Sequence, residues 1–155
     1  IACGTGPSMT SAAKSKLVLI VDDEDDVREL LALLLERDGY RVKCACDGDE
    51  GLERAKALKP DLVITDHVMP GLSGLQLVRA MAQIPGLATT KIILVTGAPR
   101  AAVLQDAAGP IDIAAFLPKP STWKIIRETV HACLGDGTES PPSRDLLTTS
   151  IGETK

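Results

Sequence analysis

Aromatic residues are scarce in this chain of 155 residues, since Phe, Trp and Tyr occur once each. The side chains on which the bases of single-stranded nucleic acids stack are therefore almost missing. A basic excess is also lacking, because 21 acidic residues against 17 lysines and arginines give a net charge of −4. We therefore expect no direct binding to nucleic acid, which needs clustered positive charge.

Long apolar runs are absent too, and none approaches the roughly 18 residues of a membrane-spanning helix. The N-terminus lacks the charged and apolar regions of a signal peptide. The four cysteines form no CxxC pair and have no histidine at metal-ligand spacing. We interpret them as reduced, small apolar side chains of a cytoplasmic protein without membrane contact.

Runs typical of buried strands alternate with segments of helical periodicity. The strands are expected at 17–21, 41–45, 62–65, 91–95 and within 111–117. The helices are expected at about 24–37, 47–58, 75–83, 99–108 and 122–134, and in the first of them the core face is assigned to Val27, Leu30, Leu31 and Leu34. Parallel strands need helical crossovers, so the alternation predicts an α/β fold with a doubly wound, five-stranded parallel sheet flanked by five helices.

The length favours one domain, which we place at residues 16–135. Residues 1–15 are expected to be an N-terminal tail that is partly vector-derived, with Met9 as a candidate natural start. Residues 136–155 are rich in Gly, Pro, Ser and Thr and are expected to be a tail or linker. They are too few for an output domain.

Polar side chains stand at the carboxyl ends of four of the expected strands. They are Asp22 and Asp23 after the first strand, Asp66 after the third, Thr96 after the fourth and Lys119 shortly after the fifth. Ligands of open parallel sheets bind beyond these strand ends, so the five side chains are expected at one edge. Each also has a structural explanation alone, because acidic residues suit helix starts and the other two suit turns or surface loops.

The three carboxylates together favour a ligand. Two carboxylates about 5 Å apart repel by roughly 3 kcal/mol at an effective dielectric near 20, so three of them call for a counter-ion. Mg²⁺ prefers oxygen ligands and leaves room for phosphate, whose oxygens Thr96 and Lys119 would bind. His67, directly after Asp66, is expected to be a partly exposed loop residue without a metal or catalytic role.

These residues, in this order, resemble the receiver domain of two-component response regulators. The matching stretches are LVLIVDDE (17–24), DLVITDHVMPGLSG (61–74), KIILVTG (91–97) and FLPKP (116–120). The resemblance implies a flavodoxin-like sheet with strand order 2-1-3-4-5. It also implies a phosphoprotein of a histidine–aspartate phosphorelay, which is a phosphorylation-activated signalling switch and not an enzyme.

The resemblance implies a role for each acidic residue. Asp66 matches the phosphoacceptor, which attacks a phosphohistidine on a partner histidine kinase or histidine phosphotransfer protein. The Mg²⁺ ligands would be Asp22, Asp23, Asp66 and the backbone carbonyl of Val68.

The resemblance also implies a switch. Thr96 matches the switch hydroxyl, Lys119 the phosphate-pairing lysine and Phe116 the switch aromatic, and the bond between Lys119 and Pro120 is often cis in such domains. A downstream protein would bind the face formed by the fourth helix, fifth strand and fifth helix. The protein would be a monomer or a weak, phosphorylation-dependent dimer.

Two other interpretations stay open. A receiver-like interaction module that works without phosphorylation usually lacks the acceptor or the lysine, and both are present here as Asp66 and Lys119. A phosphohydrolase with an aspartate nucleophile generally wants a second aspartate two residues later, where Val68 stands. The chain also departs from the family at Gly97, where alanine is commoner, and at 106–114, which predicts a short or irregular fourth helix.

Overall fold

The computed structural model describes residues 16–107 and 111–134. Over these residues, five strands form a parallel sheet in the order β2-β1-β3-β4-β5, which confirms the predicted fold class and strand order. The strands are β1 (Leu17–Val21), β2 (Arg41–Ala45), β3 (Leu62–Asp66), β4 (Lys91–Thr96) and β5 (Ala115–Pro118). β4 and β3 each extend one residue further than predicted, so that Thr96 and Asp66 are the last residues of their strands.

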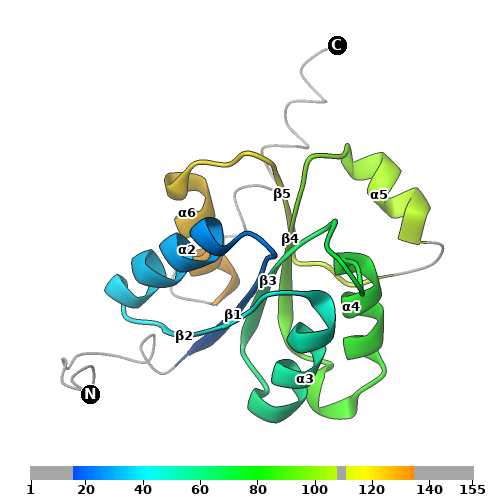
Figure 1. Cartoon of the computed structure of the whole chain (residues 1–155), viewed down its shortest axis with the longest axis horizontal. Helices are drawn as coiled ribbons and strands as arrows, with labels where there is room; N and C mark the ends of the chain where they lie inside the picture. Colours follow the sequence, from blue (N-terminus) through cyan, green and yellow to red (C-terminus); the bar gives the residue numbers. More distant parts are fainter. Residues whose placement is uncertain (1–15, 108–110, 135–155) are drawn as a thin grey trace.

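Helices cover both faces of this sheet (Figure 1). α2 (Asp25–Arg37) and α6 (Trp123–Cys133) pack on one face through Leu31, Leu35, Ile126 and Val130. The other face carries α3 (Gly48–Leu58), α4 (Gly74–Ala82) and α5 (Arg100–Ala107). Because both faces are covered, every residue of β1 and of β3 is buried, which explains the continuous apolar run of β1 and the apolar start of β3 at Leu62–Ile64.

Local signals set the helix starts next to the sheet edge. The Asp47 side chain accepts a hydrogen bond from the Glu50 N–H, three residues later, at the start of α3. Ser73 and Gln76 form a reciprocal capping box at the start of α4. Pro85–Leu87 form a short 3₁₀ turn, η2, where a loop was expected.

One predicted helix face was wrong. Leu30 was assigned to the core face of α2, but its side chain is 55% exposed, and Leu35 is fully buried instead. Five of the six residues from Leu30 to Leu35 are leucines and the sixth is alanine, so apolar side chains surround this part of the helix on all sides. Periodicity cannot choose a face in such a run; packing against α6 and the sheet does.

The predicted tails at 1–15 and 136–155 lie outside the described residues, as do residues 108–110 after α5. α5 has eight residues, two fewer than the helix predicted at 99–108. Among the described helices, none is long and apolar enough to cross a membrane.

Candidate functional site

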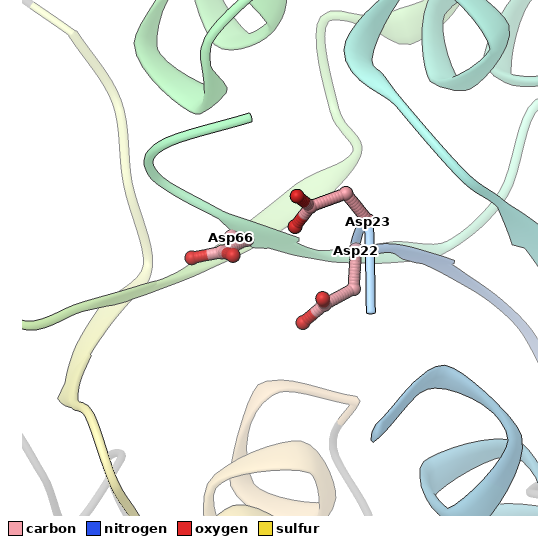
Figure 2. Close-up of side chains that lie close together, drawn as sticks. All are labelled: Asp22, Asp23 and Asp66. Atoms are coloured by element: carbon pink, nitrogen blue, oxygen red, sulfur yellow. The ribbon is translucent and has the colours of Figure 1, made fainter. Parts of the chain in front are cut away.

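Three carboxylates meet at the carboxyl edge of the sheet. β1 and β3 are neighbours with Val21 opposite Thr65, so the residues that follow, Asp22 and Asp66, stand side by side. Each of Asp22, Asp23 and Asp66 offers a carboxylate oxygen, and these oxygens all lie within 4.8 Å of one another. Figure 2 shows the three side chains projecting from the ends of the two strands. The structure thus brings together the acidic residues that the sequence placed at one edge.

Burial and a neighbouring negative charge both disfavour the ionised form of Asp22. Its side chain is 6% exposed, and burial raises the pKa of its carboxyl, as does the negative charge of Asp66. The Glu24 N–H, which donates to Asp22 Oδ1 at 2.8 Å, lowers the same pKa. Arg28 donates to the Asp22 carbonyl at 2.8 Å and fixes the backbone there. A cation between the carboxylates would offset their repulsion, and their all-oxygen donor set fits Mg²⁺.

Both oxygens of Asp66 accept hydrogen bonds. Lys119 Nζ donates to Oδ2 at 2.9 Å, and the His67 N–H donates to Oδ1 at 2.8 Å. Burial works against the charge of Lys119, but the hydrogen bond and the negative charge of Asp66 raise the pKa of Lys119 overall. The Lys119 N–H also donates to the Thr96 carbonyl at 3.0 Å, and the bond between Lys119 and Pro120 is cis. The lysine therefore stays charged beside the carboxylate.

Thr96 is buried at the end of β4, and its side-chain hydroxyl has two polar contacts. Its Oγ1 accepts from the Ala98 N–H at 3.0 Å and lies 2.9 Å from Nδ1 of His67. His67 is partly exposed, as expected, but its contact with Thr96 was missed. The register of the folded sheet makes them neighbours, because Asp66 pairs with Val95 and the contact joins the residues that directly follow this pair.

Phe116 and Val68 are not part of the cluster of carboxylates, and one is buried while the other is exposed. Phe116 is 8% exposed and packs with Leu94 and Val103, and the Arg100 guanidinium lies 5.0 Å from the centre of its ring. Val68 is 75% exposed, so its side chain takes no part in the core. Their assigned roles stay predictions.

Comparison with known proteins identifies the family of the chain. The family model described as "Response regulator receiver domain" matches residues 18–131. The chain therefore belongs to the response regulator receiver domains of two-component signalling.

The relatives of the chain include one protein that the match covers almost completely and others that are longer. It is 33% identical to Protein PilH from Pseudomonas aeruginosa over 119 residues, which are 76% of this chain and 96% of PilH. It is 33% identical to Transcriptional regulatory protein CseB from Streptomyces avermitilis over 140 residues, which are 86% of this chain but 57% of CseB. The chain thus spans little more than half of that regulator, and less than a third of the alkaline phosphatase synthesis regulator PhoP from Bacillus subtilis.

A solved structure of similar shape carries a relevant ligand. It is the response regulator protein TrrA from Thermotoga maritima in complex with Mg²⁺-BeF, at 31% identity and a TM-score of 0.66. The match covers 77% of this chain and 99% of TrrA.

Proposed function

We propose that this receiver domain is switched by phosphorylation of Asp66, with a phosphohistidine of a partner histidine kinase or histidine phosphotransfer protein as donor. The observation that carries the proposal is the position of Asp66. Its carboxylate lies within 4.8 Å of those of Asp22 and Asp23 and accepts a hydrogen bond from Lys119. The carboxylate that would act as the nucleophile thus lies between two other carboxylates, which would hold a metal ion, and the charged amine of Lys119.

In the proposed transfer, a carboxylate oxygen of Asp66 attacks the phosphorus while the phosphorus–nitrogen bond of the donor breaks. The electron pair of that bond leaves with the imidazole. Mg²⁺ would be held by Asp22, Asp23, Asp66 and the Val68 carbonyl. When bound, the ion would supply positive charge that reduces the repulsion between the Asp66 carboxylate and the phosphoryl group. Lys119 would neutralise the phosphoryl oxygens, since phosphoryl transfer depends mainly on positioning and charge stabilisation.

The signal would pass from the phosphoryl group to a protein-binding face. A phosphoryl dianion on Asp66 would attract the Thr96 hydroxyl, and the Phe116 side chain on the neighbouring strand β5 would move with it. The face that changes would be that of α5, β5 and α6, where a downstream protein binds. We place the protein in the cytoplasm, as a monomer or a weak, phosphorylation-dependent dimer, and as a switch whose own hydrolysis of the acyl phosphate is slow.

Incubation with acetyl phosphate and Mg²⁺, followed by intact-mass measurement, tests the proposal. The wild-type protein should gain the mass of one phosphoryl group, and Asp66→Asn should gain none. Asp112→Asn removes an exposed carboxylate elsewhere and is the matched control, so it should be labelled like the wild type. A wild type that takes up no phosphate would support the phosphate-independent interaction module instead.

A further inference from the structure

His67 contacts both groups that the proposed switch requires. Its backbone N–H donates to Asp66 Oδ1 at 2.8 Å and to the Val95 carbonyl at 3.0 Å. Its ring Nδ1 lies 2.9 Å from Thr96 Oγ1. The backbone of one residue therefore orients the acceptor, and its side chain orients the hydroxyl on the neighbouring strand.

The hydroxyl of Thr96 has a single proton to donate. Ala98 N–H donates to Thr96 Oγ1, so the oxygen already serves as an acceptor. In the tautomer of His67 that carries its proton on Nε2, Nδ1 accepts the hydroxyl proton. Thr96 then has no proton left for a phosphoryl oxygen on Asp66.

We propose that His67 is a positioning residue that holds the Thr96 hydroxyl in the unphosphorylated domain and competes with the phosphoryl group for its proton. The inference rests on the proposed function of Asp66 and Thr96. The bond between His67 and Thr96 must break before the hydroxyl reaches the phosphoryl group. His67 therefore stabilises the unphosphorylated state relative to the phosphorylated one.

The surroundings of the ring give it room to move. His67 lines a hollow of about 500 Å³ together with Ala98 and the α5 residues Ala102, Gln105 and Asp106. A ring released from Thr96 would stay beside α5, one of the elements of the proposed output face. The ring that contacts the hydroxyl thus borders the same hollow as that helix.

The affinity of the protein for fluoroberyllate in the presence of Mg²⁺ tests the competition at one fixed pH. His67→Leu removes the acceptor, and we expect about fivefold tighter binding, the effect of one ordinary hydrogen bond. His67→Asn places a carbonyl oxygen near the position of Nδ1 and should restore the wild-type affinity. Gln105→Leu introduces leucine into the same hollow without removing the contact with Thr96 and should leave the affinity unchanged.

Repeating the His67→Leu substitution in a protein that already carries Thr96→Val separates a positioning role of His67 from a general structural effect. Thr96→Val removes the hydroxyl and keeps the shape of the side chain. In this background, His67→Leu should no longer change the affinity, because the two substitutions remove the same bond. An affinity that is unchanged or weaker in His67→Leu alone, or a gain that persists beside Thr96→Val, would overturn the proposal.

The ring nitrogens report the bond itself. In the metal-free protein, Thr96→Val should change the ¹⁵N chemical shift of His67 Nδ1, and fluoroberyllate with Mg²⁺ should change it in the same direction in the wild type. If Thr96→Val leaves that shift unchanged, the bond is absent and the inference fails. If the wild type binds no fluoroberyllate although the bond is present, the proposed function fails and the competition with it.

Discussion

Lys119 Nζ lies 2.9 Å from Asp66 Oδ2, although 53 positions separate the two residues in the chain. β3 and β5 are not neighbours in the sheet, since β4 lies between them. The lysine reaches the carboxylate because it follows the end of β5, where its own N–H is bound to the Thr96 carbonyl. The pair leaves a cation at the place where a phosphoryl group on Asp66 would carry its negative charge.

Removing that cation should weaken the binding of a phosphoryl analogue. We expect Lys119→Met to bind fluoroberyllate with Mg²⁺ at least about tenfold more weakly than the wild type, because a charged hydrogen bond is lost. Lys124→Met removes an exposed lysine of α6 that pairs with Glu128 and should bind as the wild type does. Titration calorimetry measures both affinities, and equal losses in the two variants would contradict a specific role for Lys119.

Neutralising Asp22 should stabilise the metal-free domain. The pKa of Asp22 is raised, mainly by burial, so the folded state disfavours its charged form. The protonated carboxyl of Asp22 therefore stabilises the folded state. This contribution is fully present below the ordinary pKa of 3.8 and is lost as the pH rises through the raised pKa. At neutral pH, Asp22→Asn should therefore raise the free energy of unfolding by about 1 kcal/mol, and the gain should disappear in acid.

Urea unfolding with and without Mg²⁺ measures this effect. Mg²⁺ should stabilise the wild type and have less effect on Asp22→Asn, which has lost a proposed ligand. Asp26→Asn, an exposed carboxylate in the first turn of α2 outside the cluster, is the control and should keep the full response to Mg²⁺. An Asp22→Asn protein that is less stable than the wild type without metal would contradict the account of charge repulsion.

Glu50 should contribute stability that depends on pH. The Cys46 N–H donates to its carboxylate at 2.8 Å and Arg54 pairs with it, and these bonds lower the pKa of Glu50 to about 2. A lowered pKa means that the contribution is present above the ordinary value of 4.5 and is lost as the pH falls toward about 2. Glu50→Gln should cost about 0.5 kcal/mol near neutral pH, discounted for solvent exposure, and less in acid.

Urea unfolding over a pH series checks the window. Glu53→Gln is the control in the same helix, since Glu53 is more exposed and pairs with Lys56 at 3.6 Å. Its effect should be smaller at every pH. A cost of Glu50→Gln that stays constant down to the acid limit would show that the charge of Glu50 is not the cause.

Gly74 should be required for stability, because nearby backbone atoms leave no room for a side chain at this position. A Cβ at this position would lie 2.3 Å from the Asp66 carbonyl oxygen and 3.1 Å from the His67 Cα. Gly74→Ala should therefore push the Asp66 segment away from its place and cost about 2 kcal/mol of unfolding free energy. Gly97→Ala is the matched control, since its Cβ would meet only the Lys119 carbonyl oxygen at 4.0 Å. Thermal unfolding compares the two, and equal melting temperatures would contradict this reading.

Most of the fold could be predicted from the sequence, because the patterns that mark strands and helix starts are local. The buried strand Leu17–Val21 is a continuous apolar run, and the Asp47 cap depends on a spacing of three residues, from Asp47 to Glu50. The exposure of Leu30 depends on how the apolar segment from Leu30 to Leu35 packs within α2, which no local pattern reveals. The acidic edge could be predicted because strand ends of a parallel sheet meet.

The contact between His67 and Thr96 could not be found in the same way. It depends on the rotamer of one ring and on the register between β3 and β4, which the order of residues along the chain does not state. The buried position of Phe116 under Arg100 depends likewise on α5. Side-chain direction at the strand ends is therefore what the structure adds to the sequence.

Chemical trapping of the phosphorylated residue tests the central claim most directly. The protein is incubated with acetyl phosphate and Mg²⁺ and treated with borohydride, which reduces an aspartyl phosphate to homoserine, and the peptides are sequenced by mass spectrometry. We predict homoserine at position 66, dependent on both the phosphodonor and Mg²⁺. Homoserine at Asp22 or Asp23 instead, or none at position 66, would contradict the assignment of Asp66 as the phosphoacceptor.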